Sequence, residues 1–354
     1  MACVQSTAWF RCLLRPHCSR LNFFFPEDIQ GRRQADGPGL RSRHDRWRAL
    51  ALLMLVGIAS GTSGCSPRGV LIGEVGQIIY DGQAAYEQEP DLYLLSQSFP
   101  AHFKLMEALS INDPRNVQLL LLIARLYGGY AFAVLETEQE ALRYDQPPAI
   151  GLGLSTEKIA QRMAHCFQTG AEYALNALAV KHPDVRERLK TAQGAASFFD
   201  SLGRADVPAL FWYGFNLAGY IQHNLHSVHA MGQANRVESA MRRVIALDPG
   251  YYHGSAHLVM MVYYASRAPM MGGNPERAQW HYEQHRMAMP QPVRLRELYR
   301  ARFMMVRGQQ REAFTRTMSE LSAEVRRQAP LALLDSVAAH RAAVYLRVAD
   351  QFFD

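Results

Sequence analysis

Two stretches rich in aromatic residues carry the side chains best suited to binding a ligand. Trp212 and Tyr213 lie in DVPALFWYGFNLAGYI (Asp206–Ile221), an apolar helix-forming stretch that begins near Pro208. Pockets for small molecules are lined mostly by apolar and aromatic side chains with few polar groups, so Trp212, Tyr213 and Phe215 are candidates for a pocket wall. Ordinary packing between helices produces the same pattern more often, and this alternative stays open.

Arg267 is the charged candidate. It follows Tyr263 and Tyr264 on a predicted helix that ends before Pro269, and Tyr263 and Arg267 share a face because they are four residues apart. A guanidinium can bind a carboxylate through two parallel hydrogen bonds, as an organic acid would require. Alternatively, an arginine at a helix C-terminus stabilises the helix dipole and the last carbonyl groups. The predicted ligand-binding residues are Trp212, Tyr213, Tyr263 and Arg267.

The other reactive side chains form no convincing catalytic or metal site. His223, His226 and His229 are spaced by three residues, but no acidic residue lies between them. Three imidazoles on one helix would need further ligands to hold zinc or copper. Cys166 has no base beside it in the sequence and is expected to be a buried, apolar side chain. The chain also has no nucleophile elbow and no dinucleotide-binding motif, so we expect no enzyme activity, no metal and no cofactor.

The charge of the chain is concentrated near its N-terminus. The 354 residues have a formal net charge of +6, and in residues 1–64 nine arginines face four acidic residues. The rest of the chain is close to neutral, so it lacks the basic surface that nucleic-acid binding requires. Apolar residues make up 49% and charged residues 20% of the chain, which is the composition of a folded protein. We therefore expect a globular body with no nucleic-acid partner.

The basic segment continues into an export signal. Four arginines between Arg41 and Arg48 precede an apolar run of 12 residues, Ala49–Ser60, which is too short to span a bilayer. Small residues then lead to Cys65 in the sequence TSGC. This order is typical of a secretory signal peptide, and the cysteine makes it similar to the lipobox of bacterial lipoproteins. We expect residues 1–64 to be removed and Cys65 to be lipidated; the alternative is a short buried helix with an incidental cysteine.

The body is predicted to be all-α. Helical apolar spacing dominates from Asp91 onward, and hairpin signals are almost absent. Helix-ending prolines at 114, 183, 249 and 290 are 69, 66 and 41 residues apart, and the first two intervals are close to twice the tetratricopeptide length of about 34 residues. We expect residues 65–90 to be a lipidated tether with a first helix, and residues 91–354 to be a helical-repeat domain, a TPR-like α-solenoid with a concave binding surface.

Spacing before each proline predicts which side chains are buried. A small residue, a large one four positions later and another three positions after that share one helix face. The predicted buried sets are Ala101, Leu105 and Ala108; Ala171, Leu175 and Leu178; Val237, Met241 and Val244; and Ala278, Tyr282 and His285. In MMGGNPERA, the glycines 272 and 273 are expected to make a turn, Asn274 to cap a helix and Pro275 to take its first position.

Three blocks resemble one protein family. They are NVQLLLLIARLYGGYAFAVLE (Asn116–Glu136), DVPALFWYGFNLAGYI (Asp206–Ile221) and the stretch with GYYHG, YYASRAP and GGNPERA (Gly250–Ala278). Together they resemble the TAtT family, the tetratricopeptide-like lipoproteins associated with TRAP transporters. The resemblance implies an exported lipoprotein on the periplasmic side of the envelope that works with a TRAP-type solute-binding protein, and we expect its anchor in the outer membrane. The resemblance is also compatible with a homo-oligomer.

Two functions follow from these observations. The first is a non-enzymatic accessory lipoprotein that docks a solute-binding protein and holds a small apolar organic acid between its aromatic helices. The second is a scaffold lipoprotein for protein assembly in the envelope that binds no small ligand, because helical repeats commonly serve as docking surfaces. A closed cavity favours the first function, and an open concave face favours the second.

Overall fold

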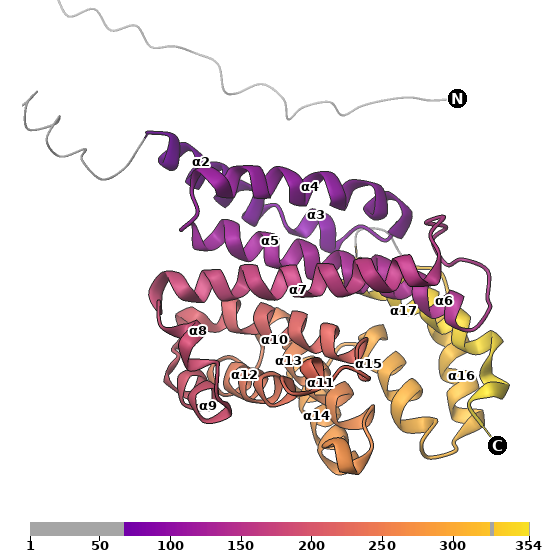
Figure 1. The fold of residues 1–354 in the computed structure, drawn as a ribbon. Helices are drawn as coiled ribbons and strands as arrows, with labels where there is room; N and C mark the ends of the chain where they lie inside the picture. Colours follow the sequence, from indigo (N-terminus) through magenta and orange to yellow (C-terminus); the bar gives the residue numbers. More distant parts are fainter. Residues whose placement is uncertain (1–66, 326–328, 354) are drawn as a thin grey trace, which may run out of the picture. The chain divides into compact units, whose positions relative to one another are not determined.

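The computed structural model describes residues 67–325 and 329–353, and in these ranges the chain is helical with no β-strand. The all-α prediction is confirmed. The signal peptide and Cys65 lie outside the described residues. Figure 1 shows the helices in chain order.

The N-terminal half contains the helices α2 (Pro67–Asp81), α3 (Ala84–Glu87), α4 (Leu92–Asn112), α5 (Val117–Tyr130), α6 (Glu136–Arg143), α7 (Thr156–Lys181), α8 (Val185–Arg188) and α9 (Ala192–Ser201). The C-terminal half contains α10 (Val207–Gln222), α11 (Val228–Met231), α12 (Ala234–Leu247), α13 (Tyr251–Ala265), α14 (Pro275–Ala288), α15 (Arg294–Tyr299), α16 (Arg311–Leu321) and α17 (Ala332–Arg347). Two π-helical segments, η1 (Ala131–Leu135) and η4 (Arg300–Met305), and three short 3₁₀ turns, η2 (Arg204–Asp206), η3 (Pro269–Met271) and η5 (Ala349–Gln351), join them.

Polar side chains begin several of these helices. The side chains of Asp91, Asn116 and Ser155 accept backbone N–H groups of the first turns of α4, α5 and α7. Asn274 does the same for α14 at 2.9 Å, and Pro275 takes the first helical position. The predicted cap and turn at MMGGNP are confirmed. Each such cap satisfies an N–H group that has no partner inside its helix, which stabilises a helix by about 1 kcal/mol.

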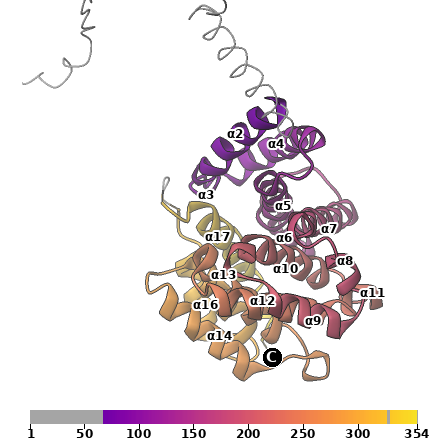
Figure 2. The same cartoon turned by 90° about the vertical axis from the view of Figure 1, so that its left-hand side faces the viewer.

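The core is built around α5, α7 and α10, which pack side by side (Figures 1 and 2). Asn216 of α10 is fully buried between the other two helices, and its Nδ2 donates to the carbonyl oxygens of Ala124 and Trp212 at 3.2 and 2.8 Å. A Cβ atom at either Gly128 or Gly170 would lie 2.4 Å from the Oδ1 atom of Asn216. The close approach of the three helices therefore requires glycine at both positions.

One stretch in the described residues, Val117–Arg143, is long and apolar enough to cross a membrane by composition alone. It joins α5, η1 and α6, and the mean hydropathy of its most apolar 18-residue window is 1.6. Within the folded body, 78% of its most apolar window is buried. Helices at the centre of a protein core have the same character, and this stretch packs on α4, α7 and α10.

The predicted buried faces are confirmed for three helices and wrong for one. The sets on α7, α12 and α14 are buried, as is Cys166. On α4, however, Ala101, Leu105 and Ala108 are exposed, and the buried side chains include Phe99, Phe103 and Met106. The larger apolar surface of the phenylalanines decides the orientation of α4, because Phe103 stacks on Tyr127 of α5 with 4.4 Å between ring centroids.

The last long helix returns to the beginning of the body. Arg341 of α17 has 1% of its surface exposed, and it bonds the side chains of Glu136 and Thr137 at 2.9 and 3.1 Å. Ser336 donates to the carbonyl oxygen of Pro90 at 2.6 Å. Figure 1 shows α17 beside α6. These contacts join segments more than 200 residues apart and close the arrangement of helices around its interior.

Candidate functional site

A cavity of about 130 Å³ lies between η1, α7, α10 and α13, with α15 and α17 completing its wall. Most of its lining is apolar. The main lining side chains are Phe132, Phe167, Trp212, Phe215, Leu258, Val259, Val262, Tyr263, Leu295 and Leu333. An apolar and aromatic lining with a few polar groups is typical of a site for an apolar ligand.

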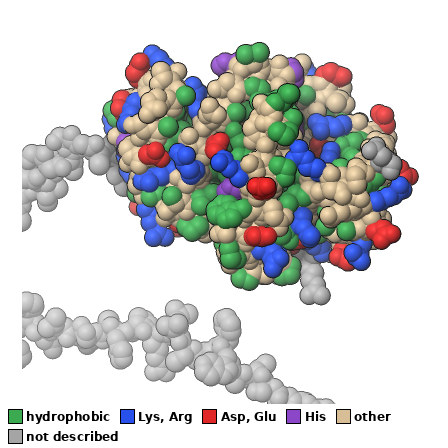
Figure 3. Space-filling model, turned by 90° about the horizontal axis from the view of Figure 1, so that it is seen from below, with side chains coloured by type: hydrophobic (Ala, Val, Ile, Leu, Met, Phe, Trp, Pro, Cys, Tyr) green, Lys and Arg blue, Asp and Glu red, His purple; other side chains and the backbone are tan. Residues whose placement is uncertain are grey.

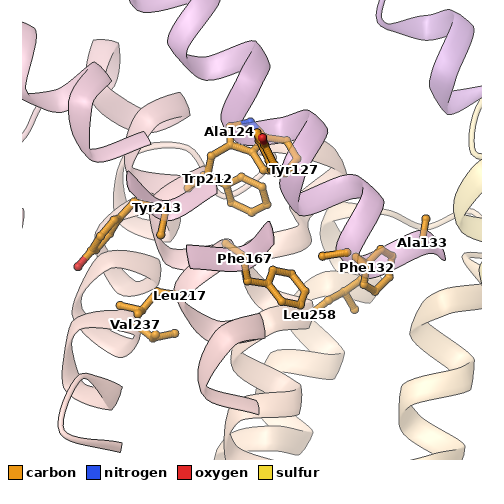
Figure 4. Close-up of a cluster of buried hydrophobic side chains, with 14 of the residues drawn as sticks. Ala124, Tyr127, Phe132, Ala133, Phe167, Trp212, Tyr213, Leu217, Val237 and Leu258 are labelled. Carbon is orange, nitrogen blue, oxygen red and sulfur yellow. The ribbon is translucent and has the colours of Figure 1, made fainter. Parts of the chain in front are cut away.

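The cavity brings together three of the four predicted ligand-binding residues. Trp212, Tyr263 and Arg267 all line it. Tyr213 lies on a different face of α10 and lines a separate pocket with Arg186 and Arg236. Figure 4 shows Tyr213 pointing away from Phe132 and Phe167.

Arg267 is the unusual residue of the cavity. It is 4% exposed, and its guanidinium carbon lies 3.8 Å from the centre of the Tyr263 ring. Its Nη1 donates to the carbonyl oxygen of Tyr263 at 3.0 Å, as the helix-end interpretation requires. Its buried Nε has no hydrogen-bond partner, and no carboxylate among the described residues forms an ion pair with it. Burial lowers the pKa of Arg267. Within the described residues, the cavity thus contains a buried positive charge that no carboxylate contacts directly.

The loop after α13 holds the backbone of Arg267 closely. A Cβ atom at Gly273 would lie 2.0 Å from the carbonyl oxygen of Arg267, so only glycine fits there. Gly272 has a φ of 87°, which also favours glycine. The two glycines let the loop fold back tightly over the end of α13, which fixes the position of Arg267.

A strained turn forms another part of the wall. Tyr252, His253 and Gly254 have φ values of 45°, 58° and 68°, so the first turn of α13 is left-handed. Side chains disfavour this conformation by about 1–2 kcal/mol per residue. The turn places the Tyr252 ring 5.0 Å from that of Trp212, and the Arg125 guanidinium lies over both rings. Backbone strain of this kind often marks a functional site.

The polar end of the cavity is an ion-pair cluster. Glu136 pairs with Arg341 at 2.9 Å, and the Nε2 of His223 lies 3.6 Å from its other oxygen. Burial by itself would raise the pKa of Glu136, but the charges of Arg341 and His223 outweigh it and hold the pKa at about 2. The ring of His223 stacks on Phe167 with 6.1 Å between centroids. Glu136 therefore remains ionised and paired at neutral pH.

The three histidines of HNLHSVH do not share a helix. The helix α10 ends at Gln222, so His223 follows its last turn and lines the cavity. His229 belongs to α11 and lines the separate pocket beside Tyr213. The expected arc of imidazoles on one helix is therefore wrong. The described residues contain no group of three metal-ligating side chains.

Comparison with known families accounts for most of the chain. The family model of the TRAP transporter T-component, TAtT, matches residues 88–353. The chain belongs to the TAtT family. The match includes every segment that lines the cavity.

A curated relative of this TAtT chain is an uncharacterised protein of Treponema pallidum (strain Nichols). The two sequences are 29% identical over 210 residues, which is 57% of this chain. The matched part covers 62% of the relative, so it spans less than two thirds of that protein's length.

Several cavity residues of this TAtT protein were not among those predicted. Phe132 and Phe167 come from η1 and α7, and their apolar spacing equals that of ordinary core residues. Gly219 lies against the Phe167 ring, which would be 2.4 Å from a Cβ atom at that position. A glycine within an aromatic helix signals a close approach, and that signal could have identified the wall.

Proposed function

We propose that the chain is a non-enzymatic accessory lipoprotein of a TRAP transporter that holds an apolar organic acid in the cavity. The observation that carries this proposal is the state of Arg267. A buried cation without a partner costs several kcal/mol of folding free energy. A carboxylate would supply the missing counter-charge and accept from the unpartnered Nε, while the aromatic wall would cover the apolar part of the ligand.

The location and partner in this proposal rest on the sequence and on the family. Lipidation at Cys65 would anchor the body on the periplasmic side of the envelope, in the outer membrane, because a lipid-modified cysteine with more than one acyl chain binds membranes stably. Helix pairs stacked as TPR-like repeats would present the surface that docks a TRAP-type solute-binding protein. A homo-oligomer is compatible with this arrangement.

Calorimetric titration with dodecanoic acid tests the ligand. We expect the wild-type protein to bind it and an Arg267→Met variant to bind it at least about 10-fold more weakly, because the charge-assisted hydrogen bonds are lost. Tyr213→Phe is the matched control, since Tyr213 lines the separate pocket, and it should bind like the wild type. Equal binding by the wild type and Arg267→Met would refute the role of Arg267.

The scaffold function predicts a different result. A protein that only docks partners should bind no acid in this titration, whichever variant is used. The apolar cavity with its aromatic lining supports the ligand-holding function over the scaffold.

A further inference from the structure

A second cavity of about 360 Å³ adjoins the apolar one. It is lined by arginines and glutamates from α6, η4 and α17, and we name it the arginine chamber. The two cavities share five lining residues, which form their common wall: Glu136, Gln222, His223, Val262 and Tyr299. A ligand in the apolar cavity therefore lies next to the arginine chamber.

The arginine chamber has more positive than negative groups. Four arginines and two glutamates line it. Arg341 pairs with Glu136 at 2.9 Å, and Arg143 pairs with Glu140 at 3.2 Å. Arg302 and Arg307 pair with no carboxylate in the described part of the chain. The chamber thus keeps two positive charges that its own acids do not balance.

Arg302 is held in a fixed orientation by neutral groups. Its Nη2 donates to the hydroxyl group of Tyr144 at 3.0 Å. Its guanidinium carbon lies 4.5 Å from the Phe352 ring centroid and 5.4 Å from that of Tyr345. Stacking on ring faces leaves the N–H groups at the edge of the guanidinium free to bind a carboxylate in two parallel bonds. The site is therefore prepared for an anion.

Irregular backbone occurs on both sides of the common wall. The π-helical segment η4 (Arg300–Met305) contains Arg302, and η1 (Ala131–Leu135) contributes Phe132 to the apolar cavity. π-Helical turns are rare and occur frequently at functional sites. Their presence at both cavities indicates that the two cavities serve one function.

We propose that the arginine chamber binds a second acidic group, so that the ligand is an apolar diacid with one carboxylate at Arg267 and the other at Arg302. This inference rests on the proposed function, because the apolar part and the first carboxylate occupy the apolar cavity. Arg307, which is exposed, adds attraction at the open side of the chamber.

Paired titrations with dodecanoic acid and dodecanedioic acid test the proposal on the full-length protein. We expect the diacid to bind the wild type at least about 10-fold more tightly than the monoacid, since a second charge-assisted contact adds about 1.4 kcal/mol or more. Arg302→Gln should reduce the diacid to the affinity of the monoacid and leave the monoacid unchanged. Arg302→Lys should retain part of the preference, because it keeps the charge but loses the paired hydrogen bonds.

Controls separate the possible failures. Arg186→Gln removes an arginine from the separate pocket and should alter neither affinity. Equal affinities of the two acids for the wild type would overturn the diacid proposal and leave the monoacid function intact. If neither acid binds the wild type, the proposed function fails as well. Binding of inorganic phosphate that depends on Arg302, with no preference for the diacid, would show an independent anion site and also contradict the proposal.

Discussion

At the scale of single residues, the contacts of Arg267 fit a role in ligand binding better than a role in stabilising the fold. A side chain present only for the fold would be expected to have its charge paired. Arg267 instead bonds a single carbonyl oxygen and stacks on Tyr263 inside an apolar cavity. Among the described residues, its one hydrogen bond goes to the carbonyl oxygen of Tyr263, as expected for an arginine at the end of a helix. The remaining donors are available to a ligand.

Replacing Arg267 should therefore stabilise the protein. Because an unpaired buried charge is removed and a side chain of similar length fills the space, we expect Arg267→Met to raise the free energy of unfolding by about 1 kcal/mol. Urea denaturation of both proteins without added acid measures the difference. A loss of more than about 1 kcal/mol would mean that Arg267 is a structural residue of the α13 terminus.

At the scale of helices, α13 and α14 are joined by buried histidines. The Nδ1 atoms of His257 and His281 are 3.0 Å apart, and both side chains are buried. Burial lowers the pKa of His257 to about 4; burial, followed by the charges of His257 and Arg277, lowers that of His281 to about 3. Both histidines are therefore neutral in the folded protein at physiological pH.

This pair predicts instability in mild acid. Between the unfolded pKa of about 6.5 and the lower folded values, the unfolded chain binds more protons, so stability falls as the pH falls. We expect each histidine of the pair to contribute a loss of about 2 kcal/mol between pH 7 and pH 5, measured by urea denaturation. The double variant His257→Phe/His281→Phe should lose less stability than the wild type, with a remainder from the buried His285, whose pKa burial also lowers to about 4. His226→Gln, at an exposed position, should behave like the wild type. An unchanged pH dependence in the double variant would exclude the pair as the cause.

The helices were more predictable from sequence than their arrangement. Caps and turns depend on neighbouring residues, so Asn274 and Pro275 could be placed from the sequence alone. The buried face of α4 could not be predicted in this way, because Phe103 is buried through its contact with Tyr127 on another helix. The four-residue spacing placed Tyr263 and Arg267 on one helix face. That Trp212 and Tyr213 line different pockets depends on which helices surround α10, and the local sequence does not show this.

At the scale of the whole molecule, the return of α17 completes the wall of the apolar cavity. Arg341 lies about 200 residues from its partners Glu136 and Thr137, and no local pattern indicates that contact. The proline spacing therefore predicted a solenoid with a concave binding surface and could not predict which helices close around a cavity. The structure has a cavity with the arginine chamber beside it. Outside, basic and acidic side chains alternate over the face in Figure 3 and form no single basic field there.

The central claim is that this protein carries a small organic acid. Native mass spectrometry of the full-length protein, purified from its own envelope, tests it most directly. We expect a bound small molecule whose mass is that of an organic acid, present in the wild type and in Tyr213→Phe and absent from a folded Arg267→Met variant. A folded wild-type protein that carries no small molecule but co-purifies with another envelope protein would contradict the claim and support the scaffold.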